Sequence, residues 1–267
     1  MGFSAVLYRG FRQVKAGVEL IPGAHRAYKW ITTRTGEGKV YEIARGPMAG
    51  LRWRRRNCLP FWYHLGIYEP ETSRFLAAHL RPGDTFWDLG ANAGYHTLIA
   101  ARAVGAAGRV VAVEPDPATC EILREQLQLN GIGNCTVVQA AVSDRAGRTL
   151  LVRRASDPRG NALQQIDNPA IDNKEGDLVE VPSLTLDDLS ALHPAPRLIK
   201  MDIEGAEVLA LPAGKRLLSG AGRPQRLLVA VHGEEARTFC HRFLRDIGYE
   251  LEPAPDLDAH SLVAVAR

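Results

Sequence analysis

The stretch DTFWDLGANAGYHTLIA, residues 84–100, decides the fold. It begins as an apolar strand, passes through a glycine-rich turn and continues directly as a helical pattern. In open α/β sheets nucleotide cofactors bind at such a turn, where the N-terminus of the helix faces the ligand. The stretch therefore predicts the first strand and helix of a nucleotide-binding sheet.

The same alternation continues along the chain. Apolar strands are expected at 109–115, 135–143, 197–203 and 226–232, each followed by polar or helical sequence, and residues 249–267 are typical of a hairpin. Nearly continuous apolar strands that alternate with amphipathic helices indicate a parallel sheet covered on both faces. We therefore predict an α/β fold with a mostly parallel sheet and an antiparallel C-terminal strand.

Two regions depart from this pattern. Residues 145–190 contain two strands around a polar stretch, which predicts an antiparallel insertion whose loop lies over a site. Residues 1–65 form an accessory segment, in which 3–20 have the apolar spacing of an amphipathic helix and 38–56 that of two short strands around a turn. The main domain is expected to span residues 66–267.

Composition narrows the class of protein. The chain has 267 residues, 46% of them hydrophobic and 24% charged, which is typical of a soluble globular protein. No apolar run approaches the roughly 18 residues of a membrane span, and no secretory signal is expected at the N-terminus. The four cysteines are widely spaced and form no CxxC pair, which argues against structural zinc and disulfides and favours the cytoplasm.

Positive charge is concentrated near the N-terminus. Residues 1–60 are strongly basic, whereas the remainder of the chain carries an excess of acids. Such an arm could contact phosphate, an anionic lipid surface or an acidic substrate, although an ordinary solvated surface is the favoured interpretation. We expect no nucleic-acid partner, we leave peripheral membrane contact open, and the oligomeric state cannot be predicted.

The glycine turn favours one cofactor over another. Its GxNxG pattern, Gly90, Asn92 and Gly94, lacks the second glycine that lets a dinucleotide pyrophosphate approach the backbone. It follows a strand-end acid, Asp88, which suits a cofactor with a cationic end. S-adenosyl-L-methionine has these properties, and NAD remains the weaker alternative.

The next two strand ends complete the expected cofactor site. Glu114 ends the second strand, where a carboxylate can accept both ribose hydroxyls. Ala141 and Val142 on the third strand are placed to flank an adenine ring. Ser143 or Asp144 could reach the adenine amine or belong to an ordinary polar turn.

Several motifs in one order resemble a known family. They are GIYEPE (66–71), LRPGDTFWDLGANAGYHT (80–97), VVAVEPDP (110–117), AAVSD (140–144), TLDDL (185–189), LIKMDIEGAE (198–207) and LLVAVH (227–232). Over residues 60–252 the chain resembles FkbM-type methyltransferases, class I enzymes that depend on S-adenosylmethionine, many of which methylate hydroxyls of sugars, glycans and macrolide-like products. The resemblance implies a Rossmann-like fold with a seven-stranded sheet. The chain departs from the family at Ala230, where an acid is usual.

The resemblance also implies a lid over the cofactor. GIYEPE would place Tyr68 and Glu69 near the methionine moiety, although acids at this position also suit the start of a helix. With the turn and the residues that open its helix, the expected cofactor-binding set is Tyr68, Glu69, Asp88, Gly90, Asn92, Gly94, Tyr95, His96, Thr97, Glu114, Ala141, Val142 and Asp202.

The motif KMDIEGAE, residues 200–207, contains candidate catalytic residues. Asp202 and Glu204 follow a buried strand at the expected ligand crevice, and His232 ends the neighbouring strand. We predict these three as the catalytic residues, one of them serving as the base. Two alternatives stay open: a metal held by Asp202, Glu204 and Glu207, or a structural role in which Lys200 pairs with Asp202 and Glu207 starts a helix. No metal is predicted, because no metal-binding pattern stands nearby.

The sequence thus predicts a methyltransferase that acts on a hydroxyl of a sugar, glycan or polyketide-type product. One alternative is an N-methyltransferase acting on a small molecule. Another is a non-catalytic cofactor-binding protein that docks RNA or membrane through the basic arm. The acceptor itself cannot be identified from the sequence.

Overall fold

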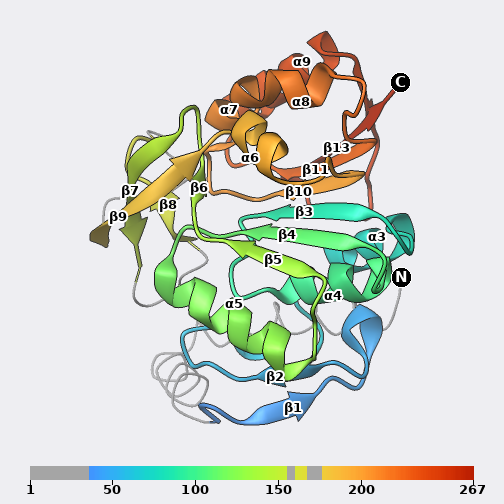
Figure 1. The fold of residues 1–267 in the computed structure, drawn as a ribbon, viewed down its shortest axis with the longest axis vertical. Coiled ribbons are helices and arrows are strands. Elements are labelled where there is room, and N and C mark those ends of the chain that lie inside the picture. Colours follow the sequence, from blue (N-terminus) through green and yellow to red (C-terminus); the bar gives the residue numbers. More distant parts are fainter. Residues whose placement is uncertain (1–35, 155–159, 167–175) are drawn as a thin grey trace, which may run out of the picture.

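The structure is a computed structural model that describes residues 36–154, 160–166 and 176–267. Its centre is a seven-stranded sheet with the strand order β12-β13-β11-β10-β3-β4-β5 (Figure 1). The strands are β3 (Thr85–Leu89), β4 (Arg109–Val113), β5 (Cys135–Val138), β10 (Leu198–Met201), β11 (Arg226–Ala230), β12 (Tyr249–Glu252) and β13 (Ser261–Ala266). β13 alone runs in the opposite direction to the other six strands.

This topology confirms the predicted fold class. Within the central sheet, the first strand is β3 at the centre. The chain then proceeds outward through β4 and β5, and it returns to the other side of β3 with β10. The strand order therefore reverses between β3 and β10, and the crevice beyond their carboxyl ends is where such sheets bind ligands. The hairpin of β12 and β13 closes the edge beside β11.

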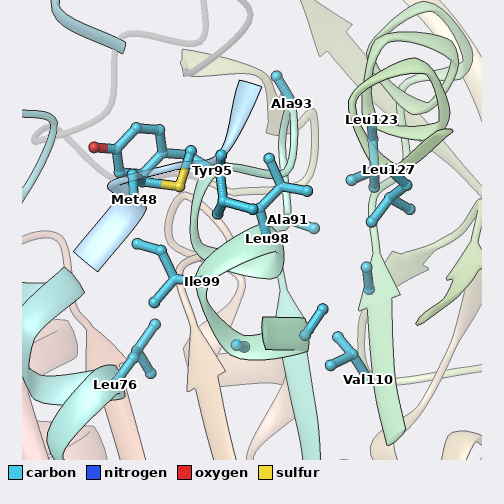
Figure 2. Packing of buried hydrophobic residues seen from close by; sticks show 14 of the residues in the cluster. Met48, Leu76, Ala91, Ala93, Tyr95, Leu98, Ile99, Val110, Leu123 and Leu127 are labelled. Carbon is cyan, nitrogen blue, oxygen red and sulfur yellow. The ribbon is translucent and has the colours of Figure 1, made fainter. Parts of the chain in front are cut away.

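Helices cover both faces of the sheet (Figure 1). One face carries α3 (Pro70–His79), α4 (Tyr95–Val104) and α5 (Pro117–Leu129), and the other carries α6 (Leu186–Leu192), α7 (Glu207–Ala210), α8 (Lys215–Ser219) and α9 (Glu234–Asp246). Alternate residues of β3 supply the two cores, since Phe86 packs on the first face while Trp87 and Leu89 pack on the second. Figure 2 shows the first core, in which Ile99 of α4 lies close to Leu76 of α3 and Leu98 lies beside Ala91.

The predicted strand at 135–143 is divided between two sheets. Its first half is β5, whereas β6 (Ala141–Val142) pairs with β9 (Asp177–Leu184) in a second sheet. That sheet also contains β7 (Gly147–Arg153) and β8 (Ala162–Leu163), and β7 runs antiparallel to both β8 and β9. The insertion is therefore an antiparallel extension, as predicted, but it begins inside the third predicted strand.

Residues 207–219, which follow β10, form a series of short helical pieces. Helix α7 is followed by a 3-10 turn, Pro212–Gly214, and then by α8. Pro212 cannot donate a backbone hydrogen bond, so a continuous α-helix is interrupted there. None of the helices in the described ranges is long and apolar enough to cross a membrane.

The described part of the accessory segment forms the predicted pair of strands. β1 (Val40–Glu42) and β2 (Arg52–Arg54) are antiparallel, with a 3-10 turn at Gly46–Met48 between them. Trp53 of β2 lies in the same core cluster as Tyr95 and Leu98 of α4. The amphipathic helix predicted at 3–20 lies outside the described residues, and the domain boundary at residue 65 stays a prediction.

Two amides of α5 bind the outer edge of β2. The side chain of Gln126 accepts from the backbone N–H of Arg54 at 2.9 Å and donates to its carbonyl at 2.8 Å. One helical turn later, Asn130 makes the same pair of bonds with Arg52, at 2.7 and 2.8 Å. The helix thus satisfies the edge of β2 in the way that a third strand would.

The arginines at 52–56 bind within the protein. The Arg56 guanidinium forms ion pairs with Glu125 of α5 and Glu37, and Arg55 is only 2% exposed. The pair of Arg56 with Glu125 therefore fastens the accessory segment to α5 of the main domain. The rest of the basic arm, up to residue 35, lies outside the described residues.

Candidate functional site

Two adjoining cavities lie at the carboxyl ends of the parallel strands. The first, here the glycine-loop cavity, is bounded among others by Gly90, Asn92, Glu114, Ala141, Val142 and Asp202. The second, here the strand-end cavity, has a volume of about 220 Å³ and is bounded among others by Glu69, Lys200, Asp202, Glu204, His232 and Asp258. Tyr68, Asp202 and Glu204 line both, so the two cavities share a wall.

Backbone contacts fix the shape of the glycine turn. Gly90 has a φ of +77°, and a Cβ there would lie 1.8 Å from the carbonyl oxygen of Asp202, so no larger residue fits. The loops after β3 and β10 therefore touch at this point. Asn92 also has a positive φ, +49°, and its N–H donates to the carboxylate of Glu114 at 2.9 Å. The turn is thereby tied to the end of β4.

Glu114 lies where the ribose acid was predicted. It is 5% exposed, lines the glycine-loop cavity and accepts a second backbone hydrogen bond from Asp116 at 3.0 Å. Burial raises the pKa of Glu114 to about 7, while the two backbone N–H groups oppose the shift. A buried carboxylate at this position is well suited to accept the hydroxyls of a ribose.

Asp88 lies behind the walls of both cavities. It is fully buried and lines neither cavity; its carboxylate accepts from Thr97 at 2.6 Å and lies 3.5 Å from the ammonium of Lys200. Its side chain points to the same face of β3 as Phe86, beneath α4, because side chains alternate along a strand. Asp88 therefore supports the site through Lys200 and Thr97, and its direct contact with the cofactor stays a prediction.

Lys200 connects the buried acid to the cavity wall. Its ammonium lies 3.5 Å from Asp88 and 3.5 Å from Asp202, and 3.4 Å from the carbonyl oxygen of Gly90. Burial disfavours the protonated ammonium and lowers the pKa of Lys200. The carboxylates of Asp202, Asp88 and Glu69 outweigh this effect, so that the pKa is raised overall. A lysine cation thus fixes Asp202 beside the glycine turn, as the predicted pairing requires.

The remaining residues of the predicted helix opening lie behind the cavity wall. Gly94, Tyr95, His96 and Thr97 line neither cavity. A Cβ on Gly94 would meet Leu123 at 2.2 Å, and Tyr95 packs against Trp53 and Tyr63. These residues shape the turn from behind it, and a direct contact with the cofactor stays a prediction for them. The periodicity of a helix start could not show which side of the turn they occupy.

The predicted lid residues do reach the site. Tyr68 lines both cavities, and Glu69 lines the strand-end cavity from the N-cap of α3, where its side chain makes no capping bond. Glu69 lies 3.7 Å from His96, whose pKa is lowered by burial and by Lys200, so the two groups do not form an ion pair near neutral pH. Burial and then the charge of Asp202 raise the pKa of Glu69 to about 7.

The expected adenine end is apolar and partly built by the insertion. Ala141 and Val142 line the glycine-loop cavity as predicted, together with Leu151, Asn161 and Leu163. Ser143 and Asp144 do not line it; the hydroxyl of Ser143 donates to Asp144 at 3.1 Å and accepts from Gln165 at 3.0 Å. The ordinary-turn alternative therefore describes these two residues better. Asn161 lies in the insertion that was predicted to lie over a site.

The predicted catalytic residues converge. Asp202, Glu204 and His232, here the strand-end triad, are half-buried, and one ligand-type atom from each lies within 4.8 Å of the other two. His232 Nε2 lies 3.8 Å from Glu204 Oε2. Glu204 has a φ of +52°, an unusual conformation for a residue with a side chain.

Glu207 holds the loop that presents the triad. It is the first residue of α7, as the helix-start interpretation expected, and it is fully buried. Its carboxylate accepts from the N–H of Ile203 at 3.0 Å. Burial raises the pKa of Glu207 to about 8 despite this bond. Glu207 does not line either cavity, which argues against its part in a metal site.

Sequence reasoning missed one group of lining residues. Asp258, His260 and Ser261 line the strand-end cavity from the C-terminal hairpin. Because β13 is antiparallel, it starts at the edge where the parallel strands end, and its preceding loop therefore reaches the site. The DAH tripeptide in a predicted hairpin turn was the signal that could have indicated them.

The residues fit the predicted cofactor. The glycine-loop cavity offers a carboxylate for a ribose, an apolar slot beside Ala141 and Val142, and acids at its other end where a cationic amino-acid tail would lie. The glycine turn leaves no side chain at Gly90, as a closely approaching ligand requires. This combination suits S-adenosylmethionine.

Comparison with known proteins identifies the domain. Residues 88–251, more than half of the chain, match the methyltransferase FkbM domain. A ribosomal protein L11 methyltransferase from Pelotomaculum thermopropionicum is 32% identical over 145 residues, which are 53% of this chain and 41% of that protein. The chain thus spans about two-fifths of the length of the curated relative that it matches.

Solved methyltransferase structures are similar at low sequence identity. A precorrin-6y C5,15-methyltransferase from Geobacter metallireducens is 17% identical with a TM-score of 0.46, covering 74% of this chain and 89% of that one. Fibrillarin from Aeropyrum pernix, in complex with S-adenosyl-L-methionine, is 13% identical with a TM-score of 0.45, covering 73% of each chain.

Proposed function

The chain belongs to the FkbM methyltransferase family, and from that premise we propose that it methylates a hydroxyl group of a sugar, glycan or polyketide-type acceptor. The cofactor would occupy the glycine-loop cavity, and the acceptor would occupy the strand-end cavity. The shared wall of Tyr68, Asp202 and Glu204 is the observation that carries the proposal, because it brings two ligands into contact at one place.

Methyl transfer to a hydroxyl requires the protein to align the acceptor oxygen and to remove its proton. Bound S-adenosylmethionine supplies a methyl carbon that an oxygen can attack in line, while the carbon–sulfur bond breaks and its electron pair stays on sulfur. The protein must align the acceptor oxygen with that carbon, and it must accept or help release the hydroxyl proton. In this proposal the strand-end triad performs both tasks, which its position in the lining of the strand-end cavity supports.

The lining of the strand-end cavity supports an acceptor that is polar and not anionic. Four carboxylates line it, from Glu69, Asp202, Glu204 and Asp258, together with Lys200, which is already bound between Asp88 and Asp202. A phosphate or carboxylate on the acceptor would be repelled, whereas hydroxyl groups can donate hydrogen bonds to the carboxylates. A neutral polyhydroxylated molecule fits this chemistry.

An amine acceptor is the second candidate. The same carboxylates would attract a protonated amine, and the curated relative is named a methyltransferase of a ribosomal protein. Incubation of the full chain with radiolabelled S-adenosylmethionine, neutral sugars and aminosugars distinguishes the two. Label that is transferred to hydroxyl-only acceptors supports the proposal, and label that is transferred only to amines supports the second candidate.

Asp202→Asn tests the site itself. We expect this variant to keep its fold and to lose methyl transfer by at least about a hundredfold, because the carboxylate at the shared wall is neutralised. Glu234→Gln, an equal loss of charge at an exposed position, provides the control. Transfer at near-normal rates by Asp202→Asn would contradict the assignment of Asp202.

A further inference from the structure

The strand-end triad has the composition of a metal site. It combines two carboxylates and one imidazole, and one ligand atom from each lies within 4.8 Å of the other two. The residues come from different elements, because Asp202 and Glu204 follow β10 whereas His232 follows β11. No sequence pattern joins them, which is why the sequence alone predicts no metal.

The spacing is close to what one ion requires. Ions such as Mn²⁺ and Zn²⁺ bind oxygen and nitrogen at about 2.0–2.2 Å, so ligands on opposite sides of one ion lie about 4.2 Å apart. The 3.8 Å between His232 Nε2 and Glu204 Oε2 is within this range. The widest spacing exceeds it by less than about 1 Å, which side-chain rotation can close.

The charge around the triad also favours a cation, because Glu69 and Asp258 add to the two carboxylates of the triad. The strand-end cavity is lined by four carboxylates, and Lys200 is the one lysine or arginine among its described lining residues. Lys200 is shared with the buried Asp88, which adds a further negative charge. The cofactor brings a net single positive charge, so the cavity remains negative when the cofactor is bound. A divalent ion would compensate the remaining carboxylates.

The ligand set also selects the kind of ion. Mg²⁺ and Ca²⁺ prefer oxygen ligands alone, whereas imidazole suits first-row transition metals. Three protein ligands leave coordination positions open, as catalytic sites require. The cavity of about 220 Å³ beside the triad provides room for an acceptor oxygen at such a position.

We propose that Asp202, Glu204 and His232 bind a divalent transition-metal ion, represented by Mn²⁺, that activates the acceptor hydroxyl. The inference rests on the proposed function and specifies how the site works. A hydroxyl bound to the ion loses its proton more readily, and the proton leaves to water at the open cavity mouth. The oxygen then forms its bond to the methyl carbon while the carbon–sulfur bond of the cofactor breaks, the electron pair stays on sulfur and S-adenosylhomocysteine leaves; the metal is neither oxidised nor reduced.

The test is titration of Mn²⁺ alone into the full-length chain after treatment with EDTA and buffer exchange. We expect one ion per chain by calorimetry, with an affinity that falls at least about tenfold in His232→Ala and in Glu204→Gln. Glu234→Gln, which removes an exposed acid close to His232 in sequence, should bind Mn²⁺ as the wild type does. This pattern supports the proposal.

Two results would overturn it: the absence of saturable Mn²⁺ binding, or equal affinities in the wild type, His232→Ala and Glu204→Gln. The second would mean an adventitious ion only. S-adenosylhomocysteine binding to the same samples shows that each variant is folded. It also separates the two proposals, because a protein that binds this ligand but not Mn²⁺ contradicts the metal site alone, whereas failure to bind S-adenosylhomocysteine contradicts the proposed function.

Discussion

Asp88 and Glu114 show how far single residues could be assigned from the sequence. Both acids stand at strand ends beside the glycine turn, and both were predicted to contact the cofactor. The structure leaves Glu114 in the cavity wall and buries Asp88 beneath α4, where Thr97 and Lys200 bind it. A strand-end position is visible in the sequence, but the face that the side chain takes depends on the helix that covers it.

Glu114 leads to a pH-dependent prediction. Its pKa of about 7 lies above the ordinary value of a glutamate, so in the ligand-free protein the carboxyl becomes protonated as the pH falls below 7. A carboxylate that accepts two ribose hydroxyls must be ionised, so binding then requires loss of a proton. We expect the affinity for S-adenosylhomocysteine to weaken below about pH 7, by up to about tenfold per pH unit.

Calorimetric titrations between about pH 5.5 and 8 test this dependence. Glu114→Gln should bind more weakly at high pH and show a shallower pH slope, whereas Glu121→Gln, an exposed acid on α5, should match the wild type. The raised pKa of Glu114 also makes the stability of the fold depend on pH. The protonated form stabilises the ligand-free fold, and that contribution is lost as the pH rises through 7. An unchanged slope in Glu114→Gln would refute the role of this residue.

At the level of elements, the apolar periodicity of the sequence predicted the strands and helices themselves better than it predicted which strands pair. The strands and helices around the central sheet follow the expected pattern, because buried strands and amphipathic helices have distinct apolar spacing. The division of 135–143 into β5 and β6 was missed, since both halves are apolar and only their partners differ. Pairing with β9 depends on residues about 40 positions away, which no local pattern contains.

The docking of β2 on α5 gives a prediction for stability. Gln126 is fully buried and bonds both backbone groups of Arg54. Gln126→Ala leaves that N–H and C=O without these partners, and we expect unfolding to become easier by about 1–3 kcal/mol. Urea denaturation measures the change.

Gln128→Ala is the matched control on the same helix. Its side chain is exposed, and the substitution should alter the free energy of unfolding by less than about 0.5 kcal/mol. Equal stability of Gln126→Ala and the wild type would mean that the amide bonds do not hold the accessory segment. Gln126 lines neither cavity, so binding of S-adenosylhomocysteine by Gln126→Ala serves as a check of its native fold.

At the level of the whole molecule, the site is assembled from parts that lie far apart in the chain. The central sheet supplies Glu114 and the triad, the insertion supplies Asn161, and the C-terminal hairpin supplies Asp258. The family match confirms the prediction of a methyltransferase domain that uses S-adenosylmethionine. The acceptor side was harder to predict, because its walls come from loops whose position is set by topology and not by local sequence.

The most direct test of the central claim is equilibrium binding of S-adenosylhomocysteine and NADH to the purified chain. We predict saturable binding of one S-adenosylhomocysteine per chain, no saturable binding of NADH, and a loss of at least about tenfold in affinity for S-adenosylhomocysteine in Glu114→Ala. Binding of NADH in place of S-adenosylhomocysteine, or an undiminished affinity in Glu114→Ala, would contradict the account.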